Sequence, residues 1–181
     1  MLELHSTIAA HTGPAPSRVA PATDNGPATW QPSAMTETTT SAAYDISTDP
    51  ARLDADRIHR WLSTDAYWAL GRARDVQDRA MAGSLNFGVY DRVSGEQVAY
   101  GRVVTDHATF AWLCDVYVDP VARGKGLGTE LVAAAREQLA RQGVRRFMLA
   151  TEDAHGVYEK VGFKSLENPS MWMSQDLQDP S

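Results

Sequence analysis

Three glycines and two cationic residues alternate in one short stretch, Arg123-Gly-Lys-Gly-Leu-Gly128, which separates an expected strand from an expected helix. Glycines at such a junction let the backbone adopt positive φ angles and approach a ligand closely. The free N–H groups at the start of a helix, together with the helix dipole, attract anions. Arg123 and Lys125 add positive charge at the same place. The stretch therefore predicts a phosphate- or pyrophosphate-binding turn, and a strand–helix turn without a ligand stays open as the alternative.

Two common phosphate-binding motifs do not fit this spacing. A Walker A loop ends in Gly-Lys-Ser/Thr, whereas Lys125 is followed by Gly126. A dinucleotide fingerprint, Gly-x-Gly-x-x-Gly, belongs to a parallel βαβ unit. Here the glycines follow strands whose short connections favour antiparallel hairpins. Neither nucleotide-binding class is therefore indicated.

A second motif follows the first in the chain, and the two together resemble a known family. The turn, after a strand ending Val118-Asp-Pro120, resembles the acyl-CoA loop of the GNAT superfamily of N-acetyltransferases, Arg/Gln-x-x-Gly-x-Gly/Ala. The segment Ala154-His-Gly-Val-Tyr-Glu-Lys-Val-Gly-Phe163 resembles the family's Ala-x-x-Leu-Tyr-x-Lys-x-Gly-Phe. The resemblance covers about residues 84–175. One departure is Thr151, where many members carry Asn.

The resemblance implies a reaction and a cosubstrate. Members move an acetyl group from acetyl-CoA to an amine, so we expect an N-acetyltransferase that acts on a primary amine of a small molecule or peptide. The amine attacks directly, through a tetrahedral intermediate whose oxyanion the N–H of Val116 or a neighbour stabilises. A non-catalytic acyl-CoA-binding or sensor module is the alternative. The expected acetyl-CoA contacts are Val116, Tyr117, Val118, Arg123, Gly124, Lys125, Gly126, Leu127, Gly128 and Thr129.

Two residues are candidates for proton transfer. Tyr158 stands where the family often places the general acid that protonates the leaving thiolate. Simple packing of its ring is the alternative. Asp115, in the expected third strand, could act as the general base, although a carboxylate satisfied by a neighbouring arginine is the slightly preferred interpretation.

Three further residues are candidates for acceptor binding. Tyr67 and Trp68 fall in an aromatic loop beside Gly71, where they could form a pocket wall. His155 lies three residues before Tyr158, so a helix would place both on one face. A plain surface imidazole or a helix cap is an equally open interpretation of His155.

Hydrophobic periodicity predicts the elements that must position these residues. In the helix expected over 73–82, Val76, Ala80 and Met81 should face inward, and in the strand over 84–90 Leu85 and Phe87 should share a face with Val89. The other expected elements are helices over 54–62, 129–139 and 153–161, and strands over 97–104, 109–118 and 144–150, with one or two final strands at Phe163 and Met171–Met173. This order predicts an α/β (α+β) fold: a mixed, mostly antiparallel central sheet flanked by helices.

Composition divides the chain into a tail and one domain. Ala, Pro, Ser and Thr occupy 26 of the first 43 of the chain's 181 residues. Such a segment cannot bury enough apolar surface to offset its chain entropy. We therefore expect a disordered low-complexity tail over 1–43 and a single domain over 44–178. Translation starting at Met35 is a duller explanation of the same pattern. The N-terminus has neither the basic start nor the apolar stretch of a signal peptide, which favours a cytoplasmic protein.

Charge and cysteine content exclude several classes of partner. The net charge of −6 argues against nucleic acid, including a toxin acting on charged tRNA. The chain has no apolar run of the roughly 18–20 residues that a membrane-spanning helix needs. Cys114 is the single cysteine, so neither an internal disulfide nor a structural zinc cluster is expected. The expected partner is thus the amine acceptor alone, for a monomer or a homodimer.

Overall fold

The computed structural model describes residues 40–41, 43–175 and 177. Within these residues one six-stranded sheet has the order β1-β2-β3-β4-β5-β6, and its neighbours are antiparallel except for the parallel pair β5 and β6. The strands are β1 (Thr40–Ser41), β2 (Tyr44–Ser47), β3 (Leu85–Asp91), β4 (Gln97–Thr105), β5 (Phe110–Val118) and β6 (Arg146–Met148). The mixed, mostly antiparallel sheet confirms the predicted fold class.

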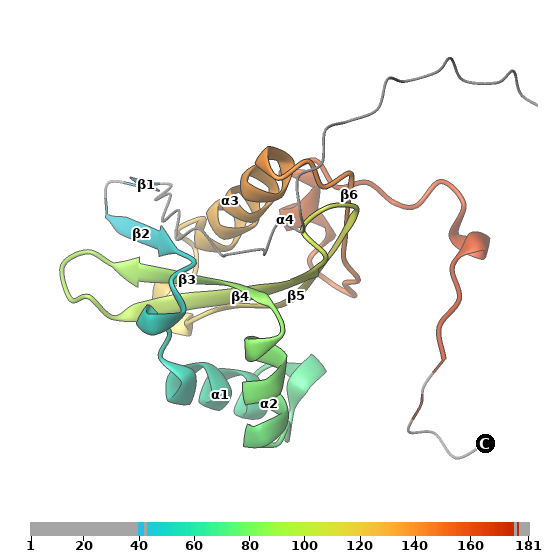
Figure 1. The fold of residues 1–181 in the computed structure, drawn as a ribbon. Coiled ribbons are helices and arrows are strands. Elements are labelled where there is room, and N and C mark those ends of the chain that lie inside the picture. Colours follow the sequence, from blue (N-terminus) through green and yellow to red (C-terminus); the bar gives the residue numbers. More distant parts are fainter. Residues whose placement is uncertain (1–39, 42, 176, 178–181) are drawn as a thin grey trace, which may run out of the picture. The chain divides into compact units, whose positions relative to one another are not determined.

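Helices cover both faces of this sheet (Figure 1). On one face α3 packs over the centre with α4 beside it, and on the other lie α1 and α2. The four helices are α1 (Ala55–Thr64), α2 (Arg74–Ala82), α3 (Leu127–Arg141) and α4 (His155–Glu159). Short 3-10 turns span Pro50–Arg52, Tyr67–Ala69, Pro120–Ala122 and Pro169–Met171. The sheet therefore separates two hydrophobic cores, a larger one under α3 and a smaller one against α1.

The larger core follows the sequence pattern closely. Leu85, Phe87 and Val89 of β3 all face it, which confirms the predicted strand face. The apolar stripe of α3 is also buried there, including Leu131. Gly101 of β4 lies beneath this helix, and a Cβ at that position would come within 2.8 Å of Leu131 Cδ2. Glycine at 101 therefore lets α3 approach the sheet closely.

Helix α2 presents a different face to the protein from the predicted one. Met81 is buried and Ala80 is half-buried, but Val76 is 42% exposed, so its inward placement was wrong. Gln77 is fully buried instead. The cause is a hydrogen bond, since the side-chain amide oxygen of Gln77 accepts from Arg72 at 2.8 Å. This bond fixes the rotation of the helix.

The C-terminal prediction was also wrong. No strand follows β6 in the part of the chain that the structure describes. Phe163 closes α4, since its N–H donates to the Tyr158 carbonyl and its ring packs against Phe147 with centroids 5.1 Å apart. Met171 and Met173 are 77% and 97% exposed beside the turn at Pro169, so their apolar pattern has no sheet to pair with.

The N-terminal boundary differs in a smaller way. The predicted tail over 1–43 lies outside the described residues, except for residues 40, 41 and 43. Of these, Thr40–Ser41 forms β1, and β2 follows immediately, where no strand was predicted. Strand β2 pairs with β3 and adds Tyr44 and Ile46 to the larger core. None of the described helices is long and apolar enough to cross a membrane.

Candidate active site

Strands β5 and β6 pair at one end and then part. Their register joins Phe110, Ala111 and Trp112 to residues 146–148. Beyond Trp112, β5 continues to Val118, and among the described residues this edge has no strand partner. A cavity of about 350 Å³, which we call the fork cleft, lies where the strands part and includes Trp112, Leu149 and Val116 in its lining. The unpaired edge can hydrogen-bond an extended ligand as a strand would.

A β-bulge interrupts β5 at the fork cleft. Tyr100 of β4 pairs with Tyr117, but Arg102 pairs with Cys114, so Asp115 and Val116 share a single opposite residue. Asp115 has a φ of 52°, in the left-handed region that few non-glycine residues adopt. A bulge leaves one residue unpaired in the ladder and changes the direction of its backbone groups. Both bulge residues line the fork cleft.

The carboxylate of Asp115 is held by two arginines. Arg72 donates to both of its oxygens, at 2.7 and 3.1 Å, and Arg102 donates through Nε at 2.6 Å. Burial alone raises the pKa of Asp115, but these hydrogen bonds and charges outweigh burial, so the pKa is lowered. The slightly preferred interpretation, a carboxylate satisfied by arginine, matches this geometry. An ionised carboxylate so stabilised is a weak base, and the general-base role stays a prediction.

Arg72 and Arg102 are the site residues that sequence reasoning missed. Both line the fork cleft, and we call them, with Asp115, the arginine–aspartate cluster. Arg72 also donates to Gln77 of α2, and Arg102 donates at 3.2 Å to the Oγ of Ser84, the residue before β3. These two hydrogen bonds help to hold the cluster in place. One signal was available for Arg102, namely a charged residue in the middle of an otherwise apolar strand.

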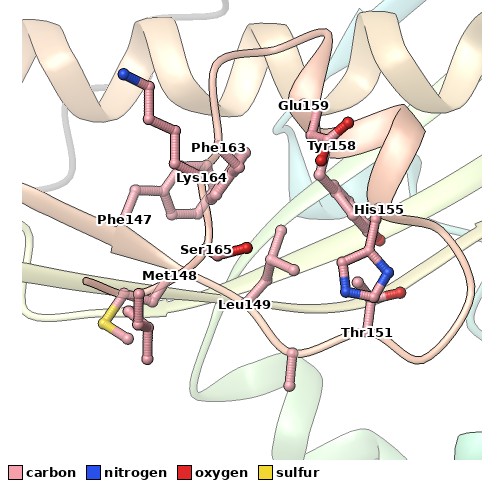
Figure 2. A pocket seen from close by; sticks show the side chains of 12 residues that line it. Phe147, Met148, Leu149, Thr151, His155, Tyr158, Glu159, Phe163, Lys164 and Ser165 are labelled. Atoms are coloured by element: carbon pink, nitrogen blue, oxygen red, sulfur yellow. The ribbon is translucent and has the colours of Figure 1, made fainter. Parts of the chain in front are cut away.

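Tyr158 lies on α4. Its half-buried ring lines the fork cleft and also a second cavity of about 280 Å³ on the β6 side of α4 (Figure 2). Burial, then Asp153 and Tyr67, raises the pKa of Tyr158, so the phenol is protonated at neutral pH. His155 lines only the second cavity of the two. Thr151 Oγ1 accepts from the N–H of Ala154 at 3.1 Å, which helps to start α4.

An aromatic pair forms the third wall of the fork cleft. Tyr67 and Trp68 lie in the 3-10 turn after α1, with ring centroids 4.9 Å apart and planes almost perpendicular. Both line the fork cleft, as expected for pocket walls. Trp61 does not line it, because this ring stacks on Tyr117 at 5.3 Å in the smaller core. Cys114 lines the cleft too, and burial raises the pKa of its thiol, so it is a neutral group.

The glycine-rich turn presents backbone N–H groups toward open space. Gly124 and Gly126 have φ angles of 77° and 82°, and a Cβ at either position would meet no atom within 4 Å. Helix α3 begins at Leu127 without a side-chain cap from the described residues, so its first N–H groups are available to an anion. Close approach and free donors are what the pyrophosphate of a coenzyme A molecule requires, and the turn fits it.

The two cations of the turn have protein partners. Lys125 Nζ donates to the Tyr44 hydroxyl at 2.8 Å. Arg123 donates to the Val118 carbonyl at 3.0 Å and to Asp65 at 3.2 Å. These side chains therefore hold the turn against the sheet and α1, while the backbone forms the anion site.

A third cavity, of about 330 Å³, adjoins the fork cleft, since Tyr67, Trp68 and Val116 line both. Its lining also includes Tyr117, Val118 and Arg123, the last of which belongs to the glycine-rich turn. The Tyr117 hydroxyl donates to Asp65 at 2.5 Å, so this side chain points to α1 and only its backbone faces the edge. Four of the predicted cofactor residues thus line the third cavity, namely Val116, Tyr117, Val118 and Arg123. Among the described residues no cluster of metal-ligating side chains was found.

This fold is that of an acetyltransferase of the GNAT type. The chain belongs to that family, since residues 55–163 match the sequence model of the acetyltransferase (GNAT) family. A curated Gibberella zeae relative, assigned as an acetyltransferase, is 35% identical over 146 residues, which are 69% of this chain and 81% of the relative. The thialysine N-ε-acetyltransferase of Mus musculus is 31% identical over 85 residues, 42% of this chain and 50% of that protein.

Two solved structures are similar in fold to this chain. The crystal structure of an assigned GNAT acetyltransferase from Xanthomonas campestris pv. campestris is 42% identical, with a TM-score of 0.69 over 74% of this chain and 93% of that one. Glucosamine-6-phosphate N-acetyltransferase from Arabidopsis thaliana, at 20% identity, has a TM-score of 0.53 over 74% of this chain and 98% of its own. This second likeness concerns the fold alone.

Proposed function

We propose that this protein transfers an acetyl group from acetyl-CoA to a primary amine of a small molecule or peptide. The observation that carries the proposal is the open edge of β5, which lies between the glycine-rich turn and the fork cleft that Tyr158 lines. The family membership supports acetyl transfer, and the name of one relative, the thialysine N-ε-acetyltransferase of Mus musculus, specifies transfer to nitrogen.

Acetyl-CoA would supply the activated acetyl group, and the chain would hold it at two places. The N–H groups between Arg123 and Thr129 suit the pyrophosphate, because Gly124 and Gly126 leave the space in front of them open. The backbone of Val116 to Val118 suits the amide groups of the pantetheine arm, since this edge has no strand partner among the described residues. Together these contacts would direct the thioester into the fork cleft.

Two groups of the chain suit the chemical step. The bulge gives Val116 a backbone that the β4–β5 ladder does not fully use, so its N–H can donate to the acetyl oxygen as negative charge develops there. Tyr158 can donate a proton to the leaving thiolate, since its raised pKa keeps the phenol protonated at neutral pH. Asp115 acts as a positioning residue that fixes the bulge through Arg72 and Arg102.

A Tyr158→Phe variant tests the acid role. We expect kcat to fall about 100-fold, the lower end of general-acid contributions, while the affinity for acetyl-CoA stays unchanged. The measurement is release of free CoA thiol against a panel of amines. Tyr90→Phe is the matched control, because it removes a buried phenol hydroxyl on β3 that has no hydrogen-bond partner in the described structure. Undiminished turnover of Tyr158→Phe contradicts the acid role, and no amine-dependent thiol release by the wild type contradicts the function.

A further inference from the structure

We propose that the acceptor amine carries a carboxylate, which Arg72 and Arg102 bind at the floor of the fork cleft. This inference rests on the proposed function and specifies its substrate class. Two guanidinium groups and one carboxylate leave one positive charge unbalanced in the arginine–aspartate cluster. Among the described residues that line the fork cleft, no others have formally charged side chains. The cluster therefore favours a monoanion, whereas Asp153, which lines the third cavity and acts on Tyr67 and Tyr158, supplies negative charge near the cleft.

The cluster also has hydrogen-bond donors to spare. A guanidinium has five N–H groups. Within the described structure, Arg72 makes three hydrogen bonds, one to Gln77 and two to Asp115, and Arg102 makes two, to Asp115 and Ser84. Their side chains remain 18% and 14% exposed, and both line the fork cleft. The remaining donors can thus reach a ligand in the cleft.

The bonds within the cluster prepare these arginines for a planar anion. Asp115, 3% exposed, holds both guanidinium groups, so little side-chain freedom remains to be lost on binding. Arginine forks match carboxylate geometry with two parallel hydrogen bonds. A phosphate monoester would bring nearly two negative charges to one unbalanced positive charge. Carboxylate is therefore the better match.

The rest of the fork cleft suits a short hydrocarbon chain between carboxylate and amine. Trp68, Trp112 and Tyr158 line it together with the cluster. At about 350 Å³ the cleft is near the lower end of the roughly 300–1,000 Å³ of ligand pockets, and the acetyl thioester must share it. An amino acid or an ω-amino carboxylic acid matches this space.

Matched acceptors test the inference on the full-length protein. Thiol release is measured with L-lysine, L-ornithine and the straight-chain ω-amino acids from glycine to 6-aminohexanoate, each beside its carboxamide, and with cadaverine and phosphoethanolamine. We expect the best acceptor to be a carboxylate whose kcat/KM exceeds that of its amide about 10- to 100-fold, the range of a hydrogen bond to a charged group. Equal or faster reaction of amides, cadaverine or phosphoethanolamine overturns the inference. Absence of thiol release with every amine overturns the proposed function instead.

Conservative arginine variants locate the effect. Arg102→Lys and Arg72→Lys keep the charge but lose the fork, so the ratio of kcat/KM between carboxylate and amide acceptors should fall toward one. A purely structural role would lower both rates together and leave the ratio unchanged, which would overturn the assignment. Arg79→Lys, on the exposed side of α2, is the control whose ratio stays at the wild-type value. If one cluster variant fails to fold, the other variant and the acceptor pairs still decide.

Discussion

The glycine-rich turn presents backbone N–H groups, whereas the floor of the fork cleft presents guanidinium groups held by a buried carboxylate. The turn depends on the lack of side chains at 124 and 126, because any residue other than glycine there strains the backbone and fills the ligand's space. In the arginine–aspartate cluster each side chain needs the others. The two regions should therefore respond differently to substitution, the turn in cosubstrate affinity and the cluster in stability and acceptor choice.

Asp115→Asn should have the largest effect on stability. It leaves two guanidinium groups in a mostly buried place without their carboxylate, and loss of one partner from a buried ion pair typically costs about 3–5 kcal/mol. Urea unfolding at neutral pH measures the loss. Asp75→Asn, which breaks an exposed i,i+4 pair with Arg79 on α2, is the control and should leave the midpoint unchanged. Similar midpoints for both variants would show that the cluster is not a stabilising unit.

The same cluster gives a pH dependence with a defined sign. The pKa of Asp115 is lowered in the folded protein, so its contribution is fully present above the unfolded value of about 3.9 and is lost as the pH falls through the folded value. The stability difference between the wild type and Asp115→Asn should therefore shrink from pH 7 to pH 3. Unfolding curves at both pH values measure this difference. A difference that widens on acidification would contradict the lowered pKa.

Gly126→Glu should abolish most acetyl-CoA binding without comparable damage elsewhere. The side chain would occupy the open space before α3 and place a negative charge among the N–H donors, so we expect the Kd to rise at least about 100-fold. Calorimetric titration with acetyl-CoA measures this. Gly95→Glu is a matched control, because Gly95 also has a positive φ, 73°, and open surroundings, but lies in the β3–β4 turn. Equal affinities for both variants would refute the anion site.

Trp68→Ala should have the smallest effect. Loss of one aromatic wall should raise the acceptor KM about 10-fold, within the contribution of an aromatic contact, and should change acetyl-CoA affinity less, although Trp68 also lines the third cavity. Steady-state kinetics with the best acceptor measure it. Trp172→Ala is the control, because Trp172 is equally exposed, 42% against 44%, but packs near Arg146. A larger rise in the KM for acetyl-CoA than in the KM for the acceptor would remove Trp68 from the acceptor wall.

The strand and the glycine-rich turn could be predicted from the sequence, whereas the side-chain contacts of the arginine–aspartate cluster could not. Alternating apolar residues such as Phe87 and Val89 predicted a core strand, and the glycine spacing predicted the turn, because both signals are local. The arginine–aspartate cluster joins Arg72 and Arg102 to a bulge, and no local pattern connects them. The wrong rotation of α2 has the same origin, since Gln77 faces inward to reach Arg72. Met171 and Met173 had a strand-like pattern, but the described residues provide no neighbouring strand to complete it.

Single-turnover transfer of an isotopically labelled acetyl group directly tests whether the protein moves acetyl from acetyl-CoA to an amine. Enzyme, acetyl-labelled acetyl-CoA and the best carboxylate-bearing amine are mixed, and free CoA and labelled acceptor are quantified together. We predict that label appears on the acceptor nitrogen in an amount equal to the CoA released, and that Tyr158→Phe slows both equally. Label that stays on CoA despite tight binding, or that leaves as acetate, would contradict it.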